Sequence, residues 1–239
     1  MIIFDIDDTL VNHSGAEKEA SIRFGTEFQN KIPEYSDQTF AQTWHDTAEK
    51  HIRSFLSGEI NFQEQRRRRI KSIFRNSKMR NEEADEIFKA YLTIYEDSWH
   101  LFDDVLEFFN KRNDVEFGVL SDGSQEQQEL KLKRTKIHHH FKFIITAESE
   151  GLSKPNPEFF LRACEFAGRQ PSDIFYVGDN LQKDAIGASK AGLRGIWLNR
   201  NENGNAEDVD MIKCLSELNG LIKSQKEIGG GKSKDIEAR

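Results

Sequence analysis

Short polar motifs, each placed directly after an apolar run or in a loop, recur at four widely separated points of this chain. They are Asp-Ile-Asp-Asp-Thr at 5–9, Ser-Asp-Gly at 121–123, Lys154, and Gly-Asp-Asn at 178–180 with Asp184 close behind. The carboxyl ends of parallel strands meet at one edge of a sheet, so such motifs can converge in space although they are far apart in sequence. The pattern predicts an α/β fold with an active site at the strand ends.

The sequence after residue 101 alternates between short apolar runs and helix-like segments. Strands are predicted at 2–5, 115–120, 143–146, 174–177 and 195–198. Helices are predicted at 105–109, 124–135, 156–168 and 181–191. Strands that alternate with helices are typical of a doubly wound parallel (Rossmann-like) sheet.

Residues 14–99 have a different pattern, helical in period, rich in charge and nearly free of Pro and Gly. Ser36, Asn61 and Asn81 are each placed to cap an amphipathic helix. Because the strand at 2–5 belongs to the sheet, this segment is an insertion, and we expect a small α-helical bundle of three or four helices. The predicted organisation is an α/β core at 1–13 and 100–228, a helical cap at 14–99, and a flexible tail at 229–239.

The first motif has the residues needed for phosphoryl transfer. Asp5 ends a strand, so its carboxylate can attack phosphorus and form an aspartyl-phosphate. Asp7, two residues on, can protonate the leaving group and then act as base on a water. Carboxylates crowded this closely repel one another, which calls for a bound cation.

The other three motifs can complete this site. Asp179 adds a third carboxylate from another strand end, and an all-oxygen ligand set of this kind suits Mg²⁺. Lys154 offers a positive charge to Asp5 and to the transferring phosphoryl group. Ser121 offers a hydroxyl, and the following amides at Asp122 and Gly123 offer hydrogen-bond donors.

With these motifs in this order, the chain resembles the haloacid dehalogenase superfamily, in the subgroup that has a helical cap inserted between the first and second motifs. The resemblance covers residues 1 to about 200. It implies that Asp5 is the nucleophile, that Asp7 is the general acid/base and also gives a main-chain oxygen to the metal, and that Lys154 steadies the nucleophile. It also implies that Ser121 binds the phosphoryl group.

The resemblance further implies that Asp179 ligates Mg²⁺, and that Asp184 holds a metal-bound water or orients the site. One departure is Asp122, where family members often carry Asn; its amide can still bind phosphate. Members that cleave carbon–halogen bonds usually lack an acid at the position of Asp7, so its presence favours phosphoryl chemistry.

The net charge, the cysteine spacing and the lengths of the apolar stretches argue against several classes of partner. The chain has 41 acidic and 34 basic residues and a net charge of −7, which argues against a nucleic-acid partner. Cys164 and Cys214 have neither metal-ligand nor disulfide-framework spacing, and no apolar stretch is long enough to span a membrane. Cleavage of an N-terminal leader would remove Asp5, so we expect a cytoplasmic protein.

Eight basic residues and no acidic one lie between 66 and 80, and for the run as a whole we expect a solvated helix face. Arg66 differs, because it lies in the middle of the apolar stripe and needs an anionic partner. We expect an ion pair inside the cap, with a substrate group as the alternative. The candidate acids are Asp46, Glu49 and Glu96.

Two histidine features receive other interpretations. His13, close to the start of the cap, is expected in an exposed loop, although it could touch substrate. The side chains of the adjacent histidines at 138–140 would point in different directions on a helix, so a shared metal site is not expected there.

These observations predict a Mg²⁺-dependent phosphatase that acts on a small phosphomonoester. A phosphotransferase or phosphomutase would share every motif. A phospho-accepting signalling domain also places acids and a lysine at parallel strand ends, but a large bundle following the acceptor Asp5 argues against it. Nucleotide, sugar phosphate and glycolate-type phosphate all fit the motifs as substrates, and the motifs carry no information on oligomeric state.

Overall fold

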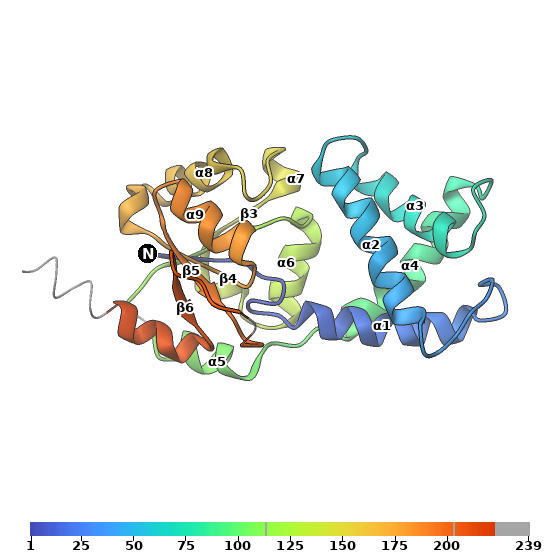
Figure 1. Cartoon of the computed structure of the whole chain (residues 1–239), viewed down its shortest axis with the longest axis horizontal. Coiled ribbons are helices and arrows are strands. Elements are labelled where there is room, and N and C mark those ends of the chain that lie inside the picture. The colour runs from blue at the N-terminus through green and yellow to red at the C-terminus, as the bar shows by residue number, and fades with distance from the viewer. Residues whose placement is uncertain (113, 203, 223–239) are drawn as a thin grey trace, which may run out of the picture.

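The computed structural model describes residues 1–112, 114–202 and 204–222. Six strands of these residues form one parallel sheet in the order β3-β2-β1-β4-β5-β6 (Figure 1). Their bounds are β1 Ile2–Phe4, β2 Phe117–Ser121, β3 Phe141–Thr146, β4 Phe175–Gly178, β5 Arg194–Leu198 and β6 Asp210–Ile212. The predicted doubly wound parallel sheet is confirmed, and β1 lies at its centre between β2 and β4.

The edge strand β6 was not predicted. It has three residues, of which only Ile212 is buried, while Met211 is exposed. A strand this short has no apolar run that could be recognised, and it is defined by its pairing with β5. The predicted tail at 229–239 lies outside the described residues.

Helices cover both faces of the sheet (Figure 1). They are α5 Asp103–Asn110, α6 Gln125–Arg134, α7 Ala147–Glu150, α8 Pro157–Ala167 and α9 Gly187–Lys190, the last preceded by a π-helical turn at Leu181–Ile186. Neighbouring residues of a strand point to opposite faces. Phe4 of β1 therefore packs against Phe108 and Phe109 of α5, while Ile3 joins the cluster that holds Phe159 of α8.

Four further helices pack together beside the sheet (Figure 1). They are α1 His13–Phe28, α2 Phe40–Leu56, α3 Phe62–Ile73 and α4 Asn81–Asp97. Their core is aromatic: the Trp44 ring lies 4.1 Å from that of Tyr91 and 5.1 Å from that of Phe24, measured between ring centroids. None of the described helices is long and apolar enough to cross a membrane.

Of the three helix caps predicted for the bundle, one is confirmed and two were wrong. Asn61 caps α3, accepting a hydrogen bond from the Glu64 amide at 2.8 Å. The other two capping predictions were wrong, because α2 begins after Thr39 and α4 begins after Arg80. Neither of those residues makes a side-chain capping bond, so packing of the apolar helix faces sets these two starts.

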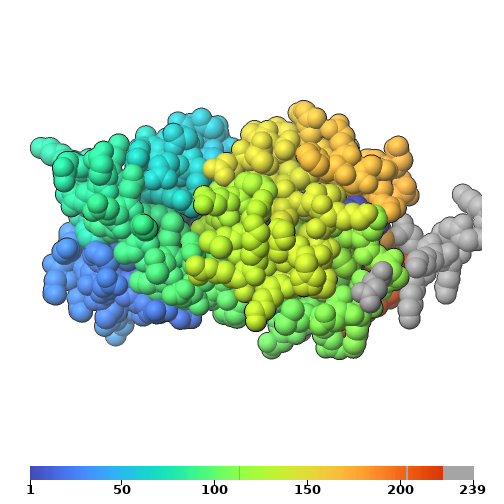
Figure 2. Space-filling view, turned by 180° about the vertical axis from the view of Figure 1, so that it is seen from behind, coloured from blue at the N-terminus to red at the C-terminus, as the bar shows by residue number. Residues whose placement is uncertain are grey.

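The chain enters α1 and leaves α4 through two segments that pair with each other. Val11 and Leu101 form an antiparallel bridge, and the Asn12 amide donates to the His100 carbonyl at 3.0 Å. The bundle also touches the sheet part through α6, where Arg134 forms an ion pair with Glu96 of α4 at 3.0 Å. Seen from behind, the blue-to-teal bundle and the yellow-green residues of the sheet part meet along one boundary (Figure 2).

Candidate active site

The ends of the three central strands bring the sequence motifs together. Asp5 follows β1, Ser121 ends β2, and Asp179 follows β4. The Asp5 amide donates to the Val177 carbonyl at 2.9 Å, which continues the β1–β4 pairing up to the first carboxylate. Asp5 and Ser121 are both buried. Sheet register thus places residues separated by more than 100 positions in one crevice.

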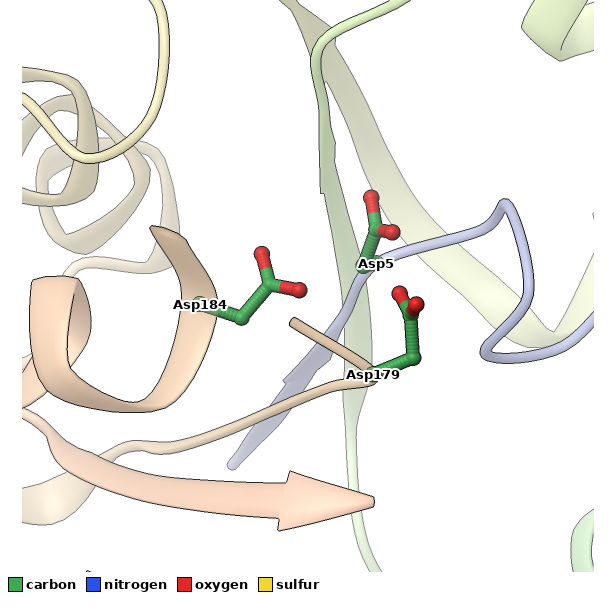
Figure 3. A group of neighbouring side chains, drawn as sticks. All are labelled: Asp5, Asp179 and Asp184. Carbon is green, nitrogen blue, oxygen red and sulfur yellow. The ribbon is translucent and has the colours of Figure 1, made fainter. Parts of the chain in front are cut away.

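Asp5, Asp179 and Asp184 form an acidic cluster (Figure 3). Each contributes a carboxylate oxygen, and these three oxygens all lie within 4.8 Å of one another. Burial raises the pKa of Asp5 above its usual range, and it raises that of Asp179 to about 7, with the negative charge of Asp184 adding to both shifts. Three crowded, partly desolvated carboxylates with only oxygen donors fit Mg²⁺, which would offset their repulsion.

Lys154 lies between two of these acids. Its ammonium is 2.8 Å from Asp5 Oδ1 and 2.7 Å from Asp184 Oδ1, and it is buried. Burial by itself lowers the pKa of Lys154, but the charges of Asp184 and Asp5 outweigh burial and hold that pKa well above its usual range. Lys154 is therefore charged, and it forms an ion pair with the Asp5 carboxylate.

The Asp122 carboxylate contacts the Lys154 loop. Its Oδ1 accepts a hydrogen bond from the Lys154 backbone amide at 2.9 Å. Burial raises the pKa of Asp122, while the charge and amide of Lys154 lower it. The side chain thus helps to position Lys154. Gly123 lies beside the Gln128 side chain so closely that an added Cβ would be 2.4 Å from Gln128 Nε2.

Asp7 does not join the acidic cluster; its carboxylate turns to α6. Lys131 forms an ion pair with Asp7 Oδ1, and Gln128 Nε2 donates to Asp7 Oδ2 at 2.7 Å and to Ser121 Oγ at 3.0 Å. Burial raises the pKa of Asp7, but the charges of Lys131 and His13 outweigh burial and hold it well below its usual range. Gln128 and Lys131 were not predicted as site residues, because in the sequence they are two polar residues among many on this helix.

Thr9, in the first motif, was also missed. Its hydroxyl accepts a hydrogen bond from the Asp179 amide at 3.0 Å and lies 3.4 Å from Asp179 Oδ1. The Trp197 indole donates to the Asp179 carbonyl at 2.8 Å. Both contacts fix the loop after β4. The signal for Thr9 was its adjacency to the acids of the first motif, whereas nothing in the sequence pointed to Trp197.

His13 was expected in an exposed loop, and this was wrong. It is the first residue of α1, and its Nδ1 lies 2.6 Å from the Tyr95 hydroxyl and 4.0 Å from Asp7 Oδ1. The ring stands edge-on to that of Tyr95. The cause is the short connection from β1, which carries His13 back over the strand ends before the helix begins.

A cavity of about 250 Å³ lies between the strand ends and the bundle. Its sheet end is lined by Asp5, Ser121 and Lys154, and its bundle end includes Arg66 and Arg69 of α3. Asp5, Ser121 and Lys154 are buried, and they share this cavity with side chains of the bundle. A substrate bound at Asp5 would therefore lie next to the bundle.

The ion pair expected for Arg66 inside the bundle was wrong. None of the described acids forms an ion pair with it, and its guanidinium lies over the rings of Phe62 and Phe88, 4.4 Å and 5.3 Å from their centroids. Of the expected partners, Glu96 pairs with Arg134 instead. The solvated face predicted for the basic run as a whole is right only in part, because Arg68 is exposed, Arg67 is half-buried and Arg69 is buried. Arg67 pairs with Asp85, and Arg68 pairs with Glu64.

Comparison with known sequences gives one family and several relatives. A family model described as haloacid dehalogenase-like hydrolase matches residues 2–198. Glyceraldehyde 3-phosphate phosphatase of Methanopyrus kandleri is 37% identical over 93 residues, which cover 39% of each chain. Pyrimidine 5'-nucleotidase YjjG of Escherichia coli is 31% identical over 111 residues, which cover 46% of this chain and 49% of that protein. The aligned residues thus span less than half the length of each of these two proteins. N-acylneuraminate-9-phosphatase of Mus musculus is 23% identical over 235 residues and 93% of both chains.

Solved structures share the fold over nearly the whole chain. The HAD-hydrolase YfnB of Bacillus subtilis, bound to magnesium and described as revealing interdomain movement, superposes with a TM-score of 0.77 at 22% identity, covering 93% of this chain and 97% of that one. L-2-haloacid dehalogenase of Xanthobacter autotrophicus superposes with a TM-score of 0.71 at 14% identity, covering 93% and 98%. At these identities the likeness extends to the fold alone.

Proposed function

This chain belongs to the haloacid dehalogenase-like hydrolase family, and we propose that it is a Mg²⁺-dependent phosphatase that hydrolyses a small phosphomonoester through an aspartyl-phosphate on Asp5. One observation carries the proposal. The Asp5 carboxylate is buried at the end of β1, held by Lys154 at 2.8 Å, and forms one acidic cluster with Asp179 and Asp184. A carboxylate fixed in this way is placed to act as a nucleophile toward phosphorus.

The first step forms a bond between an Asp5 oxygen and phosphorus while the bond from phosphorus to the leaving oxygen breaks. Asp7 donates a proton to that leaving oxygen. Lys131 pairs with Asp7 and holds its pKa well below its usual range, so Asp7 first has to take up the proton that it donates, from solvent or from the bound phosphate monoanion. The negative charge of the phosphoryl group favours this uptake, because it weakens the contact between Asp7 and Lys131. Lys131, which lines the same cavity, can then neutralise phosphoryl oxygens.

In the second step Asp7 accepts a proton from water, and the water oxygen attacks phosphorus. The acyl-phosphate bond to Asp5 breaks, which releases inorganic phosphate and restores the carboxylate. Ser121 and the amides after it bind the phosphoryl oxygens, and Lys154 keeps the Asp5 carboxylate oriented. Asp5, the Asp7 main chain and Asp179 would hold Mg²⁺, with Asp184 orienting the site; when bound, the cation supplies charge neutralisation at the phosphoryl group.

We further propose that residues 14–99 act as a cap over a core formed by residues 1–13 and 100–228. The cavity between the strand ends and α1–α4 supports this role, as does the connection of the bundle to the sheet by two adjacent segments. A pair of connecting segments permits a hinge motion, which excludes water and positions substrate. The interdomain movement described for the B. subtilis relative is consistent with such a motion.

The curated relatives named above are phosphatases or a nucleotidase, which supports phosphomonoester hydrolysis of a small phosphorylated metabolite. Their names cover three different kinds of substrate, so none of these substrates is assigned to this chain. A cavity of about 250 Å³ is near the lower end of the usual size for ligand sites and favours a small substrate.

A panel of phosphomonoesters assayed with Mg²⁺ tests the proposal. Release of inorganic phosphate from at least one of them is expected, with loss of the activity in excess chelator. Transfer of the phosphoryl group to an added sugar in place of water would make the protein a phosphotransferase or mutase. A stable phosphoprotein without turnover would instead indicate a phospho-accepting signalling domain.

A further inference from the structure

Arg69 of α3 is buried in the bundle without an acidic partner. The residue is 6% exposed and lines the cavity. Its Nη2 donates a hydrogen bond to Gln65 Oε1 at 3.2 Å, and its Nε has no hydrogen-bond partner among the described residues. The guanidinium also lies over the Trp44 and Phe88 rings, 5.7 Å and 5.4 Å from their centroids. Aromatic faces and one neutral amide offset only part of the cost of desolvating the charge, because no carboxylate pairs with it.

Arg66, three residues earlier on α3, lines the same cavity. It lies over the Phe62 and Phe88 rings and forms no ion pair with any described residue. Burial lowers its pKa, and the nearby charge of Arg69 lowers it further. Two guanidinium groups that repel each other thus face one cavity.

The other basic side chains near them on α3 have partners. Arg67 pairs with Asp85 at 2.7 Å, Arg68 with Glu64 at 3.0 Å, and Lys71 donates to Asn81 at 2.7 Å. These three residues point away from the cavity-lining side of the helix. The helix therefore provides polar partners on its outer side, while the two arginines on its inner side form no ion pair with any described acid.

The acids that line the cavity are engaged elsewhere. Glu17 of α1 binds His45 Nδ1 at 2.8 Å and forms no ion pair with Arg69. At the sheet end, Asp5, Asp179 and Asp184 form the candidate Mg²⁺ cluster. Asp7 there pairs with Lys131, and Asp122 accepts a hydrogen bond from the Lys154 amide. Between the two ends, the walls are aromatic, with the Tyr91 and Tyr95 rings stacked at 5.8 Å between centroids.

We propose that Arg66 and Arg69 form a second anion site, which binds an acidic group on the leaving alcohol of the substrate. The shared chemistry is an oxyanion, either a carboxylate or a second phosphate, held by guanidinium donors. The phosphoryl group to be transferred lies at Asp5, and the carbon skeleton lies along the aromatic walls. This inference rests on the proposed phosphatase function and narrows its substrate class.

The test compares matched substrates with and without the acidic group. One series consists of alkyl phosphates of two to five carbons, the second of the same chains ending in a carboxylate, and the third of the same chains ending in a second phosphate. We expect at least tenfold higher kcat/KM for one of the charged series over the neutral one, at the chain length that spans the cavity. The series with the larger gain identifies carboxylate or phosphate.

Substitutions then locate the preference on α3. Arg66→Gln and Arg69→Gln should each lower the charged-to-neutral ratio of kcat/KM at least tenfold. Arg68→Gln is the matched control, since Arg68 lies on the same helix with its side chain 48% exposed, and it should keep the wild-type ratio. Arg66→Lys keeps the charge without the two-pronged donor geometry and should give an intermediate ratio.

The outcomes separate the two proposals. If the wild-type protein with Mg²⁺ releases no phosphate from any series or from p-nitrophenyl phosphate, the phosphatase function itself is wrong. Hydrolysis without charge preference at every chain length overturns the second anion site and leaves the phosphatase standing. A preference that survives in both folded glutamine variants also overturns it; if Arg69→Gln does not fold, Arg66→Gln decides alone.

Discussion

Lys131 of α6 forms an ion pair with Asp7, a residue 124 positions earlier in the chain. The lysine is 1% exposed, so this charge has been taken out of water to meet the carboxylate. Gln128, one turn earlier on the same helix, donates to the other Asp7 oxygen. The helix α6 therefore sets the direction of the Asp7 carboxylate, for which we propose the acid/base role, and it also joins the bundle through Arg134.

Replacement of Lys131 by Met should lower kcat/KM at least a hundredfold, which is the lower end of what a positioned acid or base contributes. The physical reason is that Asp7 loses the charge that orients it. Lys133→Met is the matched control, because Lys133 lies on the same helix, is 55% exposed and pairs with Glu129. Steady-state kinetics on folded variants checks this, and equal activity of the two variants would contradict the role of Lys131.

Asp5→Asn should lower turnover to less than about a hundredth of the wild-type rate, because an amide is a poor nucleophile of nearly the same shape. The melting temperature of the metal-free variant should not fall, since the substitution removes one member of a cluster of like charges. Calorimetry and phosphate release measure the two effects. A variant that keeps more activity than this threshold would rule out the covalent mechanism.

Mg²⁺ should stabilise the protein more at pH 8 than at pH 5. The pKa of Asp5 is raised above the unfolded value of 3.8, and that of Asp179 is raised to about 7. Folding thus favours their protonated forms, so their contribution to the free energy of unfolding of the metal-free protein falls as pH rises from about 4 through about 7. Mg²⁺ binds the ionised carboxylates and competes with protons at the lower pH.

At a concentration of 100 times its dissociation constant, Mg²⁺ should add about 2.7 kcal/mol to the free energy of unfolding at pH 8, or roughly 5–10 °C in Tm. Differential scanning calorimetry at both pH values measures this increase. Asp179→Asn, which removes one ligand of the cluster, should lose most of it. An equal increase at both pH values, or an unchanged one in the variant, would show that Mg²⁺ binds elsewhere.

Gly178→Ala should disturb the acidic cluster, because the added methyl group on β4 would collide with Asp184. An added Cβ would lie 2.4 Å from Asp184 Cγ, and Asp184 cannot move freely because it holds Lys154 at 2.7 Å. We expect at least a tenfold rise in the Mg²⁺ concentration needed for half-maximal activity, and a loss of about 1–3 kcal/mol of stability from overpacking.

Gly220→Ala provides the control for this substitution, because a Cβ there would meet no atom of the described residues within 4 Å. A Mg²⁺ titration of activity and a thermal melt of each variant give the two readouts. Wild-type Mg²⁺ dependence in Gly178→Ala would mean that Asp184 is not needed in its observed position.

The positions of five strands and of the four motifs along the chain were readable from the sequence, because each is a local property of the chain. An apolar run followed at once by Asp5, Ser121 or Asp179 marks a buried strand and its end. Strands alternating with helices then place those ends at one edge of a parallel sheet. The edge strand β6 escaped detection because pairing with β5, and no apolar run of its own, defines it.

The direction of polar side chains on helices was decided only by tertiary packing. Lys131 and Lys133 are equivalent in the sequence, yet one is buried against Asp7 while the other is exposed. Arg66 was singled out from its place in the apolar stripe, but the sequence could not show that Glu96 pairs with Arg134 instead or that Arg69 shares the cavity. Helical period determines which residues share a face, whereas only the docking of that face against another element determines which charges are taken out of water.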